Sequence, residues 1–202
     1  MRAYLAFPGG LRAEKAFGSA SGVARDGLQG LLGRALRAGE RIEWLDPSAG
    51  RLARRVPAAM VPRPPPPAGA AAEVPFVRGY EWDEFSRADR QAFLDTEWEI
   101  EPASDRVATK LSGPSLESGP RVLDSAPLVD GTVQVTGSGR PLVFMRDRPT
   151  IGGYAKLGAV DPLALDGLAQ ARSGTAIRFV PGQPARMREE MARHERFFGL
   201  SR

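Results

Sequence analysis

Short apolar or alternating runs, separated by glycine- and proline-rich turns, fill residues 1–45 and 74–182. Alternation of apolar and polar residues over a few positions predicts half-buried strands. The strand candidates are Ala3–Phe7, Arg41–Leu45, Trp98–Ile100, Val107–Leu111, Arg121–Leu123, Thr132–Val135, Pro141–Met145 and Ala176–Val180. Many short strands with frequent turns predict a mainly β fold, a barrel or a sandwich, and not a parallel sheet with crossover helices.

Three segments follow a helical pattern instead. Ser86 and Asp89 form a capping pair, which predicts a short helix from Arg87 to Leu94. A second short helix is expected within 161–170. Near the end of the chain apolar residues return at helical spacing, so 183–202 is expected to be a helical tail; these residues are Met187, Met191 and Phe198.

Two turn-rich segments add to this organisation. Gly137-Ser138-Gly139 lies between strand candidates near positions 133 and 143 and predicts a hairpin. Residues 61–73 are dominated by proline and alanine. Proline favours an extended polyproline II conformation that builds no core of its own, so this stretch is expected to be a linker between two β-rich bodies.

Residue usage excludes several kinds of chemistry. The 202-residue chain has no cysteine and one histidine, His194. A disulfide scaffold, a thiolate nucleophile and a cysteine- or histidine-rich metal site are therefore excluded, and no metal is expected. No apolar run approaches the roughly 18 residues that a membrane span needs, and the apolar N-terminal stretch is too short for a signal peptide. We expect a cytoplasmic protein with no membrane partner.

The positive charge of the chain does not indicate a nucleic-acid partner. Lys and Arg number 28 against 24 Asp and Glu, a net charge of +4. The arginines are scattered, and the densest group, Arg51, Arg54 and Arg55, lies beside the proline-rich stretch without interleaved aromatic residues. No nucleic acid is expected as a partner.

One segment concentrates groups suited to catalysis. An apolar strand candidate ends just before Asp147, and glycines, a tyrosine and Lys156 follow within ten residues. Glycine allows a ligand to approach the backbone, and lysine pairs with a carboxylate or phosphate or acts as an acid or base. The expected catalytic residues are Asp147, Tyr154 and Lys156, and the expected ligand-binding residues are Gln134, Thr150, Gly152 and Gly153. The alternative is a charged turn behind a core strand, with the glycines serving geometry only.

A second segment, Ser104 to Pro114, offers cations for an anionic ligand. Arg106 is the residue expected to bind a ligand here, with Lys110 four residues later. The alternative is a loop contact between Asp105 and Arg106, or a solvated strand face. This segment alone is a weak signal.

Ordered sequence blocks extend over most of residues 3–180, with the proline-rich stretch outside them. The most specific is the block from Asp147 to Lys156, Asp…Thr-x-Gly-Gly-Tyr-x-Lys. The other blocks are Tyr4–Gly10, Phe17–Ser21, Gly33–Glu40, Ser104–Arg106, Leu111–Pro114, Gly131–Val135, Leu168–Gln170, Gly174 and Arg178–Phe179. In this order they resemble the KipA family, also called allophanate hydrolase subunit 2, the 5-oxoprolinase C subunit or the biotin-dependent carboxyltransferase family.

The resemblance implies a fold of cyclophilin-like β-barrels. Members carry a further N-terminal region before the Tyr-Leu-Ala block, so it also implies an N-terminally truncated chain. The implied organisation is the C-terminal remainder of a first barrel at 1–60, the linker at 61–73, a complete carboxyltransferase-type barrel at 74–182 and the helical tail at 183–202.

The activity that the resemblance implies is that of a component like the C subunit of a bacterial 5-oxoprolinase, which opens 5-oxoproline to glutamate at the expense of ATP. The implied partners are a KipI-like B subunit and an A-type subunit, with ATP acting through the complex. One alternative is the carboxyltransferase half of a urea-carboxylase or allophanate-type system. Biotin would then be carried by a partner, because the chain has no Met-Lys-Met signature. Further alternatives are a non-catalytic regulatory partner of a KipI-like protein and an inactive fragment.

The chain departs from the family pattern at four places. Pro149 replaces a polar residue, often Gln, and removes a backbone N–H beside Asp147. Ala20 replaces an arginine, which weakens an anion-binding role there. Ala108 replaces a common glycine, and Gly79-Tyr80-Glu81 replaces Gly-Pro-Gln.

Overall fold

The computed structural model describes residues 7, 9–23, 27, 34–46, 71–120 and 123–200. These residues belong to two compact units, one within 3–56 and the other holding residues 57–202. The predicted linker falls largely on residues 61–70, which lie outside the described residues.

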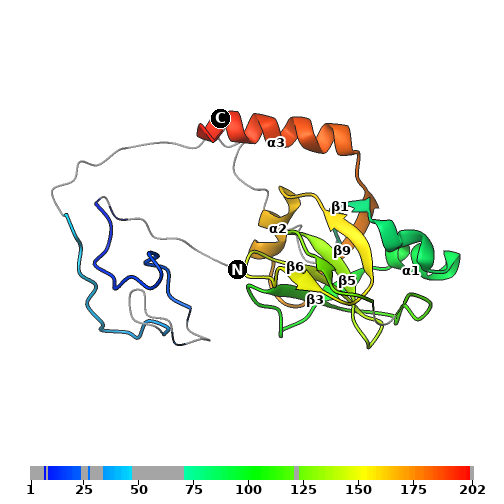
Figure 1. The fold of residues 1–202 in the computed structure, drawn as a ribbon, viewed down its shortest axis with the longest axis horizontal. Helices are drawn as coiled ribbons and strands as arrows, with labels where there is room; N and C mark the ends of the chain where they lie inside the picture. The colour runs from blue at the N-terminus through cyan, green and yellow to red at the C-terminus, as the bar shows by residue number, and fades with distance from the viewer. Residues whose placement is uncertain are drawn as a thin grey trace. The chain divides into compact units, whose positions relative to one another are not determined.

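The second unit is a closed barrel of seven strands, which confirms the mainly β fold (Figure 1). The strands follow one another around the barrel in the order β1-β8-β5-β6-β3-β2-β9, and β9 closes it by pairing with β1 in parallel. All the other neighbours in the barrel are antiparallel. Their bounds are β1 Ala72–Arg78, β2 Trp98–Ile100, β3 Ala108–Ser112, β5 Thr132–Val135, β6 Pro141–Phe144, β8 Lys156–Val160 and β9 Ala176–Pro181.

Short elements surround the barrel. A two-stranded sheet joins β4, Ala126–Pro127, to β7, Ile151–Gly152. The helices are the 3-10 helix η3 Tyr80–Glu84, α1 Arg87–Asp95, α2 Ala164–Gln170 and α3 Pro184–Phe198.

The helices confirm the capping and spacing signals. The Ser86 hydroxyl accepts a 3.1 Å hydrogen bond from the Asp89 N–H and caps α1 as predicted. Helix α2 begins three residues later than expected, because the Asp161 carboxylate accepts the Leu163 N–H and forms a turn first. Helix α3 ends at Gly199, which adopts a left-handed conformation with φ of 67°.

The predicted hairpin joins β5 to β6, with Val133 opposite Val143. Its turn is closed by a 2.9 Å hydrogen bond from the Gly139 N–H to the Thr136 carbonyl. Gly139 has φ of +75°, and a Cβ there would lie 2.0 Å from the Ser115 hydroxyl oxygen. Glycine is therefore required at this turn.

The sequence did not predict two of the barrel strands, and one predicted strand is not found among the described residues. The strands β1 and β8 were not predicted, because Pro75 interrupts one sequence and Gly158 the other. The strand β1 also begins at Ala72, inside the stretch predicted to be linker. The predicted strand at 121–123 is only partly described: Leu123 lies outside any strand, and its N–H donates to the Gly153 carbonyl.

Aromatic side chains fill the barrel. Phe93 of α1 stacks on Phe179 of β9 with ring centroids 4.4 Å apart, and both are buried. The buried Trp98 indole N–H donates a 3.0 Å hydrogen bond to the Phe93 carbonyl, so its polar atom is satisfied. Helix α1 is thereby anchored to the strands that close the barrel.

Among the described residues of the first unit, none lies in a strand longer than an isolated bridge. Leu11 pairs with Trp44, and an exposed ion pair of 2.9 Å joins Arg12 to Glu43. The predicted strand at 41–45 is thus reduced to a bridge at Trp44. The strand expected at 3–7 lies almost wholly outside the described residues, and a barrel remainder at 1–60 stays a prediction.

Candidate functional site

The barrel register places the predicted site residues at two opposite ends. Antiparallel pairing sets the last residue of β5, Val135, beside the first residue of β6, Pro141, and Gln134 beside Lys156 at the start of β8. Tyr154 and Lys156 therefore lie at this end. Asp147 follows the far end of β6, which spans four residues at about 3.3 Å each.

At the first end, Lys156 is held by Glu81 of η3. Its ammonium Nζ lies 3.5 Å from Glu81 Oε1, and its backbone N–H donates to Glu81 Oε2. Only 13% of the Lys156 side chain and 20% of the Glu81 side chain are exposed. Both charges are thus largely withdrawn from water, where an ion pair is stronger than at an open surface.

A β-bulge lies beside this contact. The register between β5 and β8 shifts between Val133, opposite Gly158, and Gln134, opposite Lys156, so β8 carries one extra residue, Leu157. Lys156 follows the shift and pairs with Gln134, and the Glu81 carboxylate accepts the Lys156 N–H. Gly79 brings η3 close to β8: its N–H donates to the Leu157 carbonyl at 2.8 Å.

Gln134 and Tyr154 complete this cluster. Gln134 is 3% exposed, and its Nε2 donates a 2.9 Å hydrogen bond to the Tyr154 carbonyl. The same carbonyl accepts from Lys156 Nζ at 3.3 Å. The Tyr154 side chain is partly exposed, so it is available to a ligand. We call Glu81, Gln134, Tyr154 and Lys156 the lysine cluster.

The predicted glycine loop supports the lysine cluster. A Cβ on Gly152 would lie 3.1 Å from Gln134 Nε2, and one on Gly153 would lie 2.8 Å from the Leu123 carbonyl. Thr150 is exposed, and its carbonyl accepts the Leu128 N–H at 2.9 Å. The two glycines are therefore needed for close packing of the loop, whatever their role toward a ligand.

At the opposite end, Asp147 pairs with Arg106. The Arg106 Nε lies 2.9 Å from one Asp147 carboxylate oxygen, and Nη2 lies 3.2 Å from the other. The side chains are 64% and 40% exposed. Arg106 also lines a cavity of about 350 Å³ together with Ser104, Thr109 and Glu101.

The predicted single constellation is therefore not formed. Asp147 was expected to act as a catalytic residue together with Tyr154 and Lys156. Its partner is Arg106, because β6 carries it to the other end of the barrel. The carboxylate beside Lys156 is Glu81, which sequence reasoning did not select. The available signal was the change of Gln to Glu in the Gly-Pro-Gln block.

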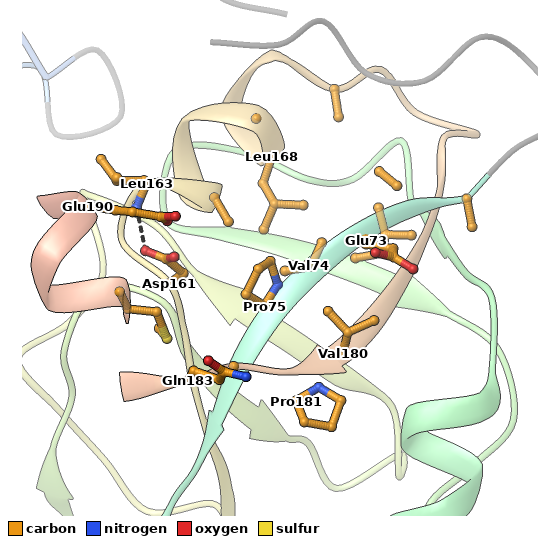
Figure 2. A pocket seen from close by; sticks show the side chains of 18 of the residues that line it. Glu73, Val74, Pro75, Asp161, Leu163, Leu168, Val180, Pro181, Gln183 and Glu190 are labelled. Atoms are coloured by element: carbon orange, nitrogen blue, oxygen red, sulfur yellow. Dashed lines mark hydrogen bonds between the residues drawn. The ribbon is translucent and has the colours of Figure 1, made fainter. Parts of the chain in front are cut away.

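A groove of about 750 Å³ lies away from the lysine cluster, between β1, β9, α2 and the start of α3. Its apolar floor includes Val74 and Leu168, and Figure 2 shows Glu190 of α3 next to Asp161. Burial is the main cause that raises the pKa of Asp161, and the Glu190 charge adds to it. The Leu163 N–H acts in the opposite direction.

Two kinds of site were not found within the described ranges. No three acidic or histidine side chains there lie close enough together to hold a metal ion. None of the described helices has the length and apolarity to cross a membrane.

The barrel, its bulge and the lysine cluster occur in a chain that matches a known domain. Residues 1–181 match the family model for the carboxyltransferase domain, subdomain A and B, and the chain belongs to this family. Helix α3 follows the matched region.

Within this family, the chain is similar in sequence to individual curated proteins. The chain is 33% identical over 181 residues to the 5-oxoprolinase C subunit of Escherichia coli and 31% identical over 180 residues to that of Haemophilus influenzae. It covers 56% and 55% of their lengths, so it spans about half of these curated relatives, which in turn match 89% of this chain.

Solved structures agree with the fold. The protein TTHA0988, whose crystal structure is known, is 35% identical in sequence to this chain. The two structures match with a TM-score of 0.64 over 85% of this chain and 31% of TTHA0988. The urea amidolyase of K. lactis has a TM-score of 0.73 at 20% identity, covering 94% of this chain and 12% of that chain. The latter likeness shows the fold alone.

Proposed function

We propose that this chain acts as the C-subunit component of an ATP-dependent 5-oxoprolinase that converts 5-oxoproline to glutamate. The observation that carries the proposal is the similarity to two 5-oxoprolinase C subunits over 89% of this chain. The resemblance implies a KipI-like B subunit and an A-type subunit as partners, and we propose the cytoplasm as the location.

In this proposal the lysine cluster handles the substrate. Lys156 donates a hydrogen bond to a substrate oxygen, and Gln134 holds the Tyr154 carbonyl that orients the Lys156 ammonium. The partly exposed Tyr154 hydroxyl is the second polar contact for the ligand. Arg106 and Asp147, at the other end of the barrel, do not contact the same small molecule.

The lysine cluster does not suit a nucleotide phosphate. Glu81 contacts the ammonium of Lys156, so a phosphate there would meet a carboxylate as well as a cation. We therefore assign ATP to the other subunits of the complex, and no step of this proposal passes through ATP on this chain.

Reconstitution tests the proposal. The chain is mixed with its cognate A and B subunits and ATP, and glutamate formed from 5-oxoproline is measured. Turnover that requires all three chains is expected. A version extended upstream to the length of the relatives serves as a parallel sample, and absence of turnover with both versions would contradict the proposal.

Carboxyl transfer is the second candidate. It is favoured by the description of the matching family, a carboxyltransferase domain, and by 25% identity over 202 residues to the urea amidolyase of Lachancea kluyveri. Biotin would then arrive on a partner chain. Transfer of labelled carboxylate from carboxybiotin to urea, in the absence of 5-oxoproline turnover, would favour this candidate.

A further inference from the structure

The lysine cluster carries a charge feature that departs from the family pattern. The resemblance places Gln where this chain has Glu81, and the structure puts that carboxylate against both the ammonium and the backbone N–H of Lys156. Gln has one acceptor oxygen and an NH2 donor, so it could replace only one of these two carboxylate oxygens, and it would leave the lysine charge unbalanced.

We infer that Glu81 is a specificity-determining residue, which neutralises Lys156 so that the site accepts an uncharged carbonyl group and not a phosphate or free carboxylate. The inference deepens the proposed function: on that function, the Lys156 ammonium faces the lactam carbonyl of 5-oxoproline, and the carboxylate of the substrate lies elsewhere.

Burial explains why the pair can act this way. Both side chains are mostly withdrawn from water, so their charges act at short range with little screening. An anion approaching Lys156 must compete with a carboxylate that is already in place. A neutral carbonyl needs only one N–H of the ammonium, which has three.

The geometry also makes Glu81 hard to displace. Its Oε2 accepts the Lys156 N–H, while Oε1 contacts Nζ. The preceding Gly79 ties the start of η3 to β8 through the Leu157 carbonyl. The carboxylate is therefore fixed by the backbone and does not depend on the ammonium alone.

Binding of inorganic phosphate to the folded 202-residue chain tests the inference without partner subunits or turnover. The affinity is measured by NMR titration for the wild type and for Glu81→Gln, with thermal unfolding as a check on folding. Removing one charge at this range is expected to raise phosphate affinity about tenfold or more. Adding Lys156→Gln to Glu81→Gln should abolish the gain.

Glu73→Gln is the matched control. Glu73 is an exposed carboxylate on β1 that pairs with Arg178 at 3.3 Å, so the variant makes the same change in net charge away from Lys156. It should leave phosphate affinity essentially unchanged. If Glu81→Gln does not fold, Glu81→Ala makes the same test, because it also frees the ammonium.

The outcomes are distinct. A gain that depends on Lys156 and is absent from Glu73→Gln supports the inference. No gain over the wild type, including no binding by either protein, overturns it, as does a gain that survives loss of Lys156. If phosphate affinity rises but the reconstituted assay produces no glutamate from 5-oxoproline, the role of Glu81 is supported and the proposed reaction is contradicted.

Discussion

The side-chain amide of Gln134 donates a 2.9 Å hydrogen bond to the backbone carbonyl of Tyr154, across the bulge between β5 and β8. The same carbonyl contacts the Lys156 ammonium, so a buried amide on one strand positions the cation on the next. The same hydrogen bond therefore stabilises the loop that carries Tyr154 and positions the ammonium of Lys156 in the candidate site.

Gln134→Leu should destabilise the barrel. It removes the buried Gln134 donor and leaves the Tyr154 carbonyl with the 3.3 Å contact to the Lys156 ammonium. The expected loss is about 0.5–1.5 kcal/mol in the free energy of unfolding. Denaturant unfolding measures this loss. Gln91→Leu is the control, because Gln91 bonds to Asp95 on the exposed face of α1 and its loss should cost less than about 0.5 kcal/mol. Equal losses for both variants would contradict the role of Gln134.

Gly153→Ala should also be destabilising. The new Cβ would lie 2.8 Å from the Leu123 carbonyl, a backbone atom that cannot move aside cheaply. We expect a loss of about 1–3 kcal/mol, as for other overpacked positions. Gly167→Ala makes the same chemical change in α2 with nothing within 4 Å, and should gain about 0.5–1 kcal/mol from helix propensity. Thermal unfolding of the pair gives the sign of each effect.

Asp161 should make stability fall as the pH rises. Its pKa is raised in the folded state, so the folded chain binds the proton more tightly than the unfolded chain does. Its stabilising contribution is present below the unfolded value of about 3.9 and is lost as the pH rises through the folded pKa. Asp161→Asn should therefore gain in stability, relative to the wild type, as the pH is raised above about 4.

Unfolding at several pH values gives this difference. Asp166→Asn, which makes the same chemical change on α2, is the control. Glu190→Gln removes the charge that faces Asp161 and should reduce the pH dependence without abolishing it, because burial is the larger cause. A constant difference between Asp161→Asn and the wild type over this range would refute the prediction.

Substitutions of Lys156 and Asp147 should have different effects on turnover in the reconstituted assay. Lys156→Gln is expected to lower turnover at least about 100-fold, because it removes the group proposed to polarise the substrate. Asp147→Asn should lower it far less, since Asp147 lies at the opposite end of the barrel. The exposed ion pair to Arg106 should contribute less than about 1 kcal/mol, so Asp147→Asn should remain folded. A larger loss for Asp147→Asn would place the reacting atoms at the Arg106 end.

The sequence correctly predicted the elements that depend on interactions between residues close together in the chain. The capping pair of Ser86 and Asp89 opens α1, and the Gly137–Gly139 turn joins β5 to β6, because neighbouring residues satisfy each other there. The strands β1 and β8 were missed because long-range pairing overrides Pro75 and Gly158. In β1 the Pro75 carbonyl still accepts the Asp161 N–H, and the neighbours Phe76 and Val160 are paired.

The sequence likewise predicted only part of the candidate site. Gln134, Tyr154 and Lys156 were selected from their chemistry and spacing, and the structure brings them together. Asp147 was selected by the same reasoning but lies apart, because the eight residues between it and Lys156 can run from one end of a barrel to the other. Glu81 is 75 residues before Lys156, so its contact had no local signal.

The sequence by itself determined a β-rich chain with few chemical options: no thiol, one histidine, and a glycine loop ending in a lysine. These follow from residue type and from periods of two or 3.6, which are properties of neighbours along the chain. The tertiary structure alone decided which carboxylate meets which cation. Barrel closure and a one-residue bulge set that pairing, because a shift of one residue redirects every side chain and every free N–H on the strand.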